Sequence, residues 1–373
     1  MIISIGILAW NEAEVIGATL RSLFEQSLLR ELAGSAHRLE VVVVPNGCSD
    51  STEQVAAAAL AAGAADLPAG RFSWRVQPLT EPGKANAWNH FVHRFSDPAA
   101  DYVFLMDADI RLTHPDTLKN MLQALERDAH AGVATDLPQK HVLFKKRKSL
   151  FDRLSLGVGQ MTQAAPAQLT GQLFCARGPL LRRIYMPPGL IVEDGFVKHM
   201  VCTDMFTAPA DNRRVVRAPE ASHVFESYTR VGDVFNNQVR QQVAHAIYAY
   251  LRDYLTARVA AGEGDAGQIV AANNARDPDW YGALIRERVR QGGRWAMYPG
   301  AFGVRFRRLR NLPRPQAALK LPVAVAAFLM DVVILVAANR RLRSGRLKGI
   351  WKDTKSYALA QTGAPASAQG EHK

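Results

Sequence analysis

The sequence predicts an α/β protein with a mostly parallel sheet and flanking helices, because strand-like and helix-like segments alternate along residues 2–129. Each predicted strand is a short apolar run, whereas each predicted helix carries apolar residues at spacings of three and four. A hydrophobic content of 48% is typical of a chain that buries a sizeable core. The predicted strands are residues 2–9, 39–44, 72–78 and 102–106, and the predicted helices are residues 13–29, 51–62, 84–95 and 117–129.

The rest of the chain predicts further segments. A helix is expected over residues 235–261, and glycine, aspartate and proline indicate a linker over residues 262–287. We therefore expect a first domain at residues 1–261, a basic helical extension at 288–355 and a disordered tail at 356–373. The three cysteines have no paired spacing, which indicates a reducing compartment rather than a disulfide framework or a zinc site.

The positive charge is concentrated near the C-terminus. Between Arg288 and Lys355, 16 basic residues face only Asp331 and Asp353, a formal charge of +14 in a chain whose total is +12. Residues 1–287 are therefore nearly neutral. A basic cluster of this kind attracts anionic partners, either lipid headgroups or nucleic acid.

An apolar segment, residues 321–339, lies inside this basic region and has the length of a short membrane-spanning helix. Basic residues flank it on both sides and Asp331 lies at its middle, which disfavours a simple crossing. We favour a helix that lies in the membrane interface, with residues 305–355 contacting an anionic membrane surface in a peripheral or monotopic manner. A buried core helix and a true crossing are the alternatives.

Polar loops follow the first two predicted strands. Asn11 and Glu12 come after the first strand, and Asn46 and Asp50 come after the second. Because the carboxyl ends of parallel strands lie at one edge of a sheet, these loops could together hold a base and a ribose. Ordinary turn and helix-capping chemistry is the alternative for each loop alone.

Two further segments indicate phosphate and metal binding. Gly83 and Lys84 open a predicted helix, where backbone N–H groups, the helix dipole and a positive charge suit a phosphate. Asp107 and Asp109 follow the strand at 102–106, and such hard oxygen ligands suit Mg²⁺ or Mn²⁺. A solvated turn is the alternative for this Asp-x-Asp pair.

These four elements, in this order and with these gaps, resemble the family 2 glycosyltransferases of the GT-A fold. Two later segments strengthen the resemblance: Thr170-Gly171-Gln172 is similar to the family's acceptor-lining segment, and Glu193-Asp194 to its catalytic acidic pair. The resemblance covers residues 1–245 and implies a Rossmann-like GT-A catalytic domain that transfers a sugar with inversion.

The resemblance also implies roles for individual residues. The expected donor-binding residues are Asn11, Glu12, Asn46, Asp50, Gly83, Lys84, Asp107, Gln238 and Arg240. Thr170 and Gly171 would line the acceptor side. Asp109, with Asp107 and His223, would bind the metal, although a lone histidine is more often structural. Asp194 would be the base beside Glu193, and on an extended segment only one of the two would face the substrate.

Two segments compete for the late Gln/Arg motif of this family. Gln238 and Arg240 lie at the spacing from Asp194 that suits it better, so we prefer them as diphosphate or acceptor contacts. The segment from Gln291 to Trp295 spells the Gln-x-x-Arg-Trp signature of processive polysaccharide synthases but lies much farther from Asp194.

The residue types fit one reaction. A divalent cation and Lys84 would stabilise charge on a departing nucleoside diphosphate, while a carboxylate removes the proton of the acceptor hydroxyl. We expect a UDP-sugar donor, a lipid-linked or polysaccharide acceptor, and a location on the cytoplasmic face of a bacterial inner membrane. The alternatives are a sugar nucleotidyltransferase and a non-enzymatic nucleic-acid-binding protein that uses the basic segment.

Overall fold

The computed structural model describes residues 1–144, 168–227, 231–298, 301–303 and 314–345. These residues form two compact units. The first contains residues 1–144, 168–227 and 263–272, and the second contains residues 231–262, 273–298, 301–303 and 314–345. The strands are β1 (Ile2–Ala9), β2 (Arg38–Pro45), β3 (Phe72–Val76), β4 (Tyr102–Asp107), β5 (Ile110–Leu112), β6 (Val133–Lys140), β7 (Leu173–Arg177) and β8 (Val215–Phe225).

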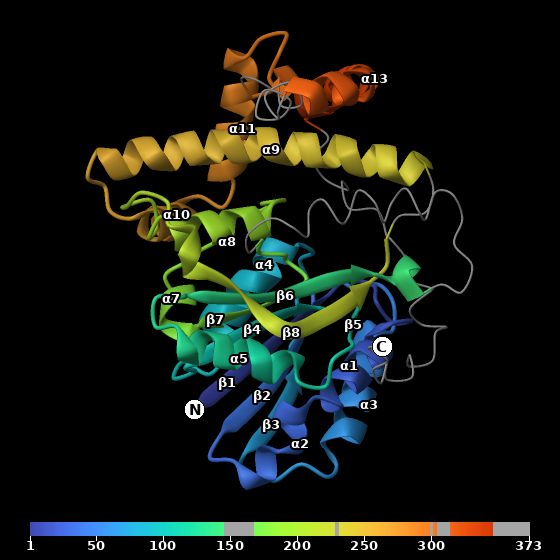
Figure 1. Cartoon of the computed structure of the whole chain (residues 1–373). Helices are drawn as coiled ribbons and strands as arrows, with labels where there is room; N and C mark the ends of the chain where they lie inside the picture. Colours follow the sequence, from blue (N-terminus) through green and yellow to red (C-terminus); the bar gives the residue numbers. More distant parts are fainter. Residues whose placement is uncertain (145–167, 228–230, 299–300, 304–313, 346–373) are drawn as a thin grey trace. The chain divides into compact units, whose positions relative to one another are not determined.

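Helices of the first unit connect these strands. The main ones are α1 (Ile16–Phe24), α2 (Ser27–Arg30), α3 (Thr52–Ala64), α4 (Lys84–His90) with the π-helix η2 (Phe91–Phe95), α5 (Thr117–Arg127), α7 (Gly178–Leu181) and α8 (Glu193–Cys202). Figure 1 shows them around the central sheet. The predicted alternation of strands and helices is confirmed for residues 2–127, with three changes: the helix expected over 13–29 is divided into α1 and α2, the helix expected over 84–95 ends in π geometry, and the short strand β5 was not predicted.

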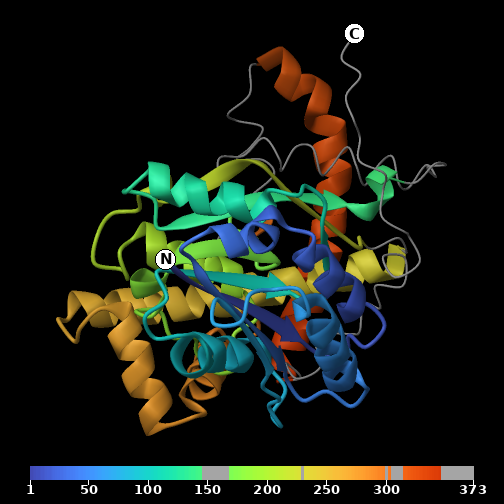
Figure 2. The ribbon, with the colours of Figure 1, turned by 90° about the horizontal axis from the view of Figure 1, so that it is seen from below.

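The eight strands form one sheet in the order β3-β2-β1-β4-β7-β6-β8-β5. The first four strands of this order pair in parallel, as do β6 and β8. Strand β7 is antiparallel to both of its neighbours, and β5 is antiparallel to β8. The predicted mostly parallel sheet is therefore confirmed, and the amino terminus leads directly into its β1 (Figure 2).

Alternate residues of β1 face two different helical layers. Ile3, Ile5 and Ile7 are fully buried in a cluster that includes apolar residues of α1, α3 and α5. Gly6 faces the opposite way, where a Cβ atom would lie 2.4 Å from the ring of Phe91 in η2. A side chain at position 6 would exclude that ring, so this glycine permits close packing of a helix on the second face.

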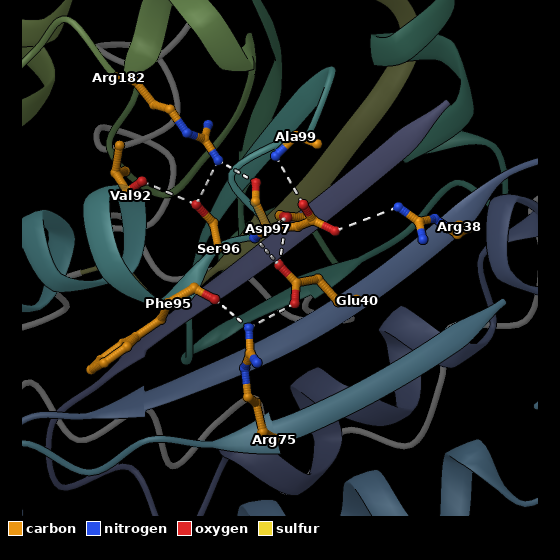
Figure 3. Close-up of polar contacts among 10 residues, drawn as sticks. Arg38, Glu40, Arg75, Val92, Phe95, Ser96, Asp97, Ala99 and Arg182 are labelled. Carbon is orange, nitrogen blue, oxygen red and sulfur yellow. Dashed lines mark hydrogen bonds and ion pairs between the residues drawn. The ribbon is translucent and has the colours of Figure 1, made fainter. Parts of the chain in front are cut away.

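A polar cluster ties the amino ends of the strands together (Figure 3). The nearly buried carboxylate of Glu40 in β2 accepts hydrogen bonds from Ser4 Oγ at 2.6 Å and from Asp97 N at 2.5 Å. Its other oxygen lies 2.8 Å from Nη2 of Arg75 in β3. Arg182 donates to the carbonyl oxygen of Asp97. The cluster fixes the chain that enters β4, at the sheet edge opposite to Asp107.

Residues 262–287, which the sequence predicts as a linker or loop, are mostly helical. They contain α10 (Ala266–Arg276) and the start of α11 (Trp280–Gln291). Gly262 and Gly264 have positive φ angles and end the preceding helix, α9 (Val231–Ala260). Gly267 serves packing rather than flexibility, because a Cβ there would lie 2.0 Å from the carbonyl oxygen of Arg183.

The second unit is helical and centres on α9 and α13 (Arg314–Arg343), the latter visible in red-orange in Figure 2. The C-terminal half of α13 is anchored within this unit. Ile334, Leu335 and Ala338 are buried there. Asn339 accepts from Ala296 N at 2.8 Å and donates to Arg294 O at 3.0 Å. Among the described helices, none combines the length and apolarity needed to cross a membrane. The predicted tail at 356–373 lies outside the described residues.

Candidate active site

The loops that follow β1, β2 and β4 begin at one edge of the sheet. In the parallel register Ala9 pairs with Pro45, and Leu8 pairs with Asp107. The three strands therefore end level with one another, which is where ligands bind in open α/β sheets. Five of the residues predicted for donor binding lie at or just after these strand ends: Asn11, Glu12, Asn46, Asp50 and Asp107.

The first two loops are joined by side chains that bind backbone groups. Asn11, in the left-handed region at φ 55°, accepts a hydrogen bond from Ser49 N at 2.8 Å through Oδ1. Asp50 accepts from Ala13 N at 3.1 Å and from the Thr52 hydroxyl at 2.5 Å. Burial alone would raise the pKa of Asp50, but these hydrogen bonds lower it below its usual value. Asp50 therefore stays ionised and fixes the loop that carries Glu12.

Asn46 connects the end of β1 to the loop that carries Lys84. Its side chain is buried, donates to Ala9 O at 2.7 Å and accepts from Gly83 N at 3.0 Å. Gly83 has φ 145°, a conformation that favours glycine. The structure thus gives Asn46 and Gly83 a role in shaping the loop, while the predicted donor contacts of both stay predictions.

Lys84 lies at the centre of the candidate site. Its Nζ atom is 2.7 Å from Asp107 Oδ1, 2.8 Å from Glu193 Oε1 and 3.2 Å from the carbonyl oxygen of Gly171. Burial would lower the pKa of Lys84, but the two carboxylates outweigh it and raise that pKa above its ordinary value. Four segments that are distant in sequence therefore meet at one ammonium group.

Asp107 ends β4 and its backbone N–H donates to the carbonyl oxygen of Gln172 at 2.8 Å. Its side chain is 20% exposed, so it faces the site rather than the core. Burial is the largest influence and raises the pKa of Asp107 to about 6, with Asp109 adding to the rise and Lys84 opposing it. A cation near the Asp107 carboxylate therefore favours its ionised form.

Asp109 follows in the short turn between β4 and β5. The turn is held from α1, because the Thr19 hydroxyl donates to Ala108 O at 2.7 Å. Over the described part of the chain, no group of three or more His, Cys, Asp or Glu side chains gathers that could hold a metal alone. Two carboxylates still fit Mg²⁺ or Mn²⁺, because such ions are commonly bound through one or two carboxylates together with substrate phosphates.

Glu193 and Asp194 lie in the first turn of α8, so the predicted extended segment is wrong. Two residues separate the pair from the turn that ends at Leu190, and the second of them, Val192, caps the helix. In a helical turn adjacent side chains are not forced to opposite faces, so both can approach one site. A Cβ atom on Gly171 would lie 3.0 Å from Glu193 Oε1 and 3.5 Å from Asp194 Cβ.

The two carboxylates of this pair have different surroundings. Glu193 forms the ion pair with Lys84, whereas Asp194 Oδ1 accepts from Gly195 N at 2.7 Å. Burial, followed by the neighbouring charge of Glu193, raises the pKa of Asp194 to about 6. Asp107 and Glu193 therefore meet at Lys84, and Glu193 and Asp194 lie beside Gly171, while the catalytic roles of these groups stay predictions.

His223 is fully buried in β8, and both of its ring nitrogens have partners. Nδ1 lies 2.7 Å from Asp136 Oδ2, and Nε2 lies 3.2 Å from Gln172 Oε1. Thr170 is half-buried beside Gly171, and its hydroxyl has no hydrogen-bond partner within the described residues. The metal role of His223 and the acceptor role of Thr170 stay predictions. The sequence analysis missed Asp136, which lies in a segment without any recognised motif.

Gln238 and Arg240 lie on α9 in the second unit. Arg240 donates to Asn237 Oδ1 on the same helix at 2.9 Å. Gln291, from the competing motif, ends α11 in the same unit and donates to Glu287 Oε1 at 2.6 Å. The assignment of Gln238 and Arg240 to the donor stays a prediction.

The fold is similar to that of a glycosyltransferase of known structure. A mannosyltransferase from Pyrobaculum calidifontis, solved in complex with GDP-Man and Mn²⁺, has a TM-score of 0.51 and 20% identity, and the match covers 91% of this chain and 86% of that chain. Glucosyl-3-phosphoglycerate synthase from Mycobacterium tuberculosis, in complex with Mn²⁺, UDP and glucosyl-3-phosphoglycerate, has a TM-score of 0.41 and 19% identity, covering 62% and 74%. The first likeness shows that the fold is GT-A.

The family follows from the sequence profile. Residues 4–183, which contain most of β1, all of β2 to β7, and Lys84 with its partners Asp107 and Gly171 but not Glu193, match the profile of glycosyl transferase family 2. No curated protein sequence matches this chain. The chain is a glycosyltransferase with a GT-A fold whose residues 4–183 match family 2, as the resemblance implied.

Proposed function

We propose that this enzyme transfers a sugar from a nucleotide-sugar donor, with a UDP-sugar favoured, to a hydroxyl of a lipid-linked or polysaccharide acceptor, inverting the anomeric centre. The observation that carries the proposal is the contact of Lys84 with both Asp107 and Glu193. It brings the residues expected on the donor side next to those expected on the acceptor side. A transferase needs this proximity because both substrates must react in one water-poor space.

The donor would bind along the three strand-end loops. Glu12, Asn11 and Asp50 belong to the loops expected to hold the nucleoside, and Lys84 is expected at the diphosphate. As the bond between the sugar and the diphosphate breaks, negative charge builds on the leaving group. The partly buried ammonium of Lys84 stabilises that charge without reorganising at the moment of reaction.

Asp194 is the better base of the acidic pair. Its raised pKa of about 6 is close to the range in which a carboxylate both stays ionised near pH 7 and accepts a proton. Glu193 is occupied by its ion pair with Lys84 and would hold the two sides of the site together. Asp194 would take the acceptor hydroxyl proton while the hydroxyl oxygen bonds to the anomeric carbon and the nucleoside diphosphate leaves.

Asp107 and Asp109 would hold a divalent cation, Mg²⁺ or Mn²⁺. When bound, such an ion neutralises charge on the diphosphate and favours its departure. The nearness of Lys84 to Asp107 means that an arriving ion would compete with the ammonium for this carboxylate.

A donor panel tests the proposed reaction. The purified chain is incubated with UDP-, GDP- and dTDP-sugars and Mg²⁺ or Mn²⁺, and the released nucleotide is identified by chromatography. Slow release of a nucleoside diphosphate and free sugar from one donor is expected. Pyrophosphate formation from a nucleoside triphosphate and a sugar phosphate would instead support a nucleotidyltransferase. Binding of RNA without any nucleotide sugar would support the non-enzymatic alternative.

We also propose that the second unit contacts an anionic lipid surface. The stretch of α13 from Leu321 to Val333 exposes large apolar side chains on successive turns: Leu321, Val325, Leu329, Met330 and Val333 are 44–63% exposed. The same helix ends with Arg340, Arg341 and Arg343. An exposed apolar stripe next to basic residues is the combination by which helices bind in the membrane interface.

The rest of the chain supports an intracellular membrane face as the proposed location. Cys48, Cys175 and Cys202 are free thiols, in keeping with a reducing compartment. Positive charge near a membrane segment favours the cytoplasmic side. We therefore place the enzyme on the cytoplasmic face of a bacterial inner membrane, where a lipid-linked acceptor would be presented.

Vesicle flotation tests this contact. The full chain is expected to float with vesicles of phosphatidylglycerol and phosphatidylcholine at low salt but not with phosphatidylcholine alone. Leu329→Gln with Val333→Gln should weaken binding by more than about tenfold, because each buried aliphatic side chain contributes roughly 1.5–3 kcal/mol. Leu143→Gln is the matched control, since Leu143 is also exposed but lies in the first unit. Full recovery of the wild-type chain in the vesicle-free fraction would contradict the proposal.

A further inference from the structure

Asp136 lies at an irregular point of the sheet. Strands β6 and β8 run in parallel, but their register shifts, so that Thr135 pairs with Arg217 and Leu137 pairs with Ser222. Four residues of β8 are therefore inserted opposite Asp136, and one of them, Glu220, has φ 51°. Such irregularities re-aim side chains and are frequent next to active sites.

The inserted residues leave Asp136 next to His223. The side chains of Asp136 and His223 are both 0% exposed, and Asp136 Oδ2 lies 2.7 Å from His223 Nδ1. The second carboxylate oxygen, Oδ1, has no hydrogen-bond partner within the part of the chain that the structure describes. A buried carboxylate with an unpaired oxygen is costly, so stability alone does not account for it.

The pair fixes which ring nitrogen of His223 faces the site. An ionised carboxylate only accepts hydrogen bonds, so His223 Nδ1 carries the hydrogen and donates it to Asp136. A ring with its one hydrogen on Nδ1 leaves Nε2 as an acceptor, and Nε2 lies 3.2 Å from the atom placed as Oε1 of the Gln172 amide. The amide fits this contact when its N–H₂ group is turned toward Nε2.

Gln172 in turn supports the central residues of the site through its backbone. Its carbonyl oxygen accepts the Asp107 N–H at 2.8 Å. The preceding carbonyl oxygen, of Gly171, accepts from Lys84 Nζ at 3.2 Å. Gly171 also lies against the carboxylate of Glu193. A shift of the 171–172 segment would therefore move Lys84 and Asp107 relative to the acidic pair of α8.

We propose that Asp136 and His223 are a buried positioning pair that fixes Gln172 and, through it, the Gly171–Gln172 segment of the active site. The changes in kcat that this inference predicts rest on the proposed function. It assigns His223 to orientation of the protein rather than to metal binding. Neither residue touches the reacting atoms, and both act through the amide of Gln172.

Two substitutions of Asp136 test the role of its carboxylate. Asp136→Ala removes the acceptor for His223 Nδ1 and should lower kcat on the order of 10²-fold, because misplacement of reacting groups by about 1 Å has an effect of this size. The KM for the donor should change much less than kcat. Asp136→Asn removes the negative charge but keeps a side-chain oxygen that can accept a hydrogen bond from His223 Nδ1. This variant should therefore keep most of the wild-type kcat, because the role assigned to Asp136 is the hydrogen bond rather than the charge.

Gln172→Ala tests whether the pair acts through the amide. Gln172 is half-exposed, so this variant should fold, and it should lose a similar factor in kcat. Because both changes break one chain of contacts, the double variant Asp136→Ala/Gln172→Ala should lose no more than either single variant. Additive losses in the double variant, or wild-type kcat in Gln172→Ala or Asp136→Ala, would overturn the proposal. If His223 served a metal instead, Gln172→Ala would leave kcat unchanged.

An NMR measurement examines the pair without relying on activity. In the chain labelled with ¹⁵N-histidine, which has 10 histidines, His223 is assigned by the signal that disappears in His223→Gln. An Nδ1–H signal protected from exchange is expected in the wild type and in Gln172→Ala, and its loss is expected in Asp136→Ala. An Nε2–H tautomer for His223 would overturn the assignment. A wild-type chain with this signal but no transferase activity would refute the proposed function and leave the pair intact.

Discussion

The Nζ atom of Lys84 lies 2.8 Å from Oε1 of Glu193, which joins the helix after the third strand to the helix that carries the acidic pair. The same ammonium contacts Asp107 at 2.7 Å. A single cation thus holds two carboxylates from opposite sides of the candidate site at a short separation. Without it, the two negative charges would face each other in a partly buried space.

Replacement of Lys84 should therefore affect catalysis strongly. Lys84→Met removes the charge expected to stabilise the leaving diphosphate and should lower kcat/KM by about 10²- to 10³-fold, as for other fixed groups that stabilise transition-state charge. Lys119→Met is the matched control, because Lys119 forms a comparable 2.7 Å ion pair with Glu31 on the surface. Steady-state kinetics of both variants with the donor found by the panel give the comparison. Equal effects of the two substitutions would contradict the role of Lys84.

Gly171 should not tolerate a side chain without loss of rate. In Gly171→Ala the new Cβ would lie 3.0 Å from Glu193 Oε1, so the carboxylate must move and its ion pair with Lys84 is disturbed. A decrease in kcat of about tenfold, with little change in melting temperature, is expected for a misplaced site.

Gly17→Ala provides the control for this substitution. Gly17 lies in α1, and a Cβ there would have its nearest contact at 3.5 Å, which is an ordinary distance. Alanine in a helix interior is favoured over glycine by roughly 0.5–1 kcal/mol, so this variant should keep its activity and gain slightly in stability. Unchanged kcat in Gly171→Ala would show that the segment is not close to the reacting groups.

The pH dependence of the reaction should report Asp194. A base must be ionised to act, and burial together with Glu193 raises the pKa of Asp194 to about 6. The rate should therefore fall as pH decreases through about 6 and level off above it. In Glu193→Gln the neighbouring negative charge is lost, so the pKa of Asp194 decreases and the acidic limb moves to lower pH. Profiles of kcat/KM for both proteins measure this shift, and a limb that stays in place would exclude Asp194 as its source.

The cluster around Glu40 should matter for stability and not for catalysis. Glu40→Gln weakens the hydrogen bonds to Asp97 N and Ser4 Oγ and leaves Arg75 without its carboxylate partner. A decrease of about 1.5–3 kcal/mol in the free energy of unfolding is expected, since a hydrogen bond to a charged group contributes this much. Denaturant unfolding measures the change, and kcat should stay at the wild-type value. A loss of activity without a loss of stability would contradict the separation of the two ends of the sheet.

The first half of the fold was predictable because its signals are local. The apolar run before Asp107 and the alternation of strands and helices fixed the parallel strands, and residues at strand ends then had to share one edge of the sheet. The loops with Asn46 and Lys84 followed from the same argument. The sequence pattern could not indicate that the Asn46 side-chain amide is buried and forms hydrogen bonds with two backbone groups.

The remaining features depend on contacts between distant segments. Glu193 was expected on an extended segment, because a short acidic sequence without a capping side chain gives no helix-start signal, yet it opens α8. Gly267 looked like a linker glycine, and only its approach to Arg183 O explains it. Asp136 gave no signal, because its pairing with His223 depends on a register shift between two strands.

The substitution Asp194→Asn tests the central claim most directly. Donor binding is measured by calorimetry and sugar transfer by product analysis, for the wild type and the variant in parallel. If the acidic pair at 193–194 and the groups around Asp107 flank one activated sugar, the variant should bind the donor with wild-type affinity and lose transfer by at least about 10²-fold, the lower end of what a general base contributes. Transfer at the wild-type rate by the Asp194→Asn enzyme would contradict the account.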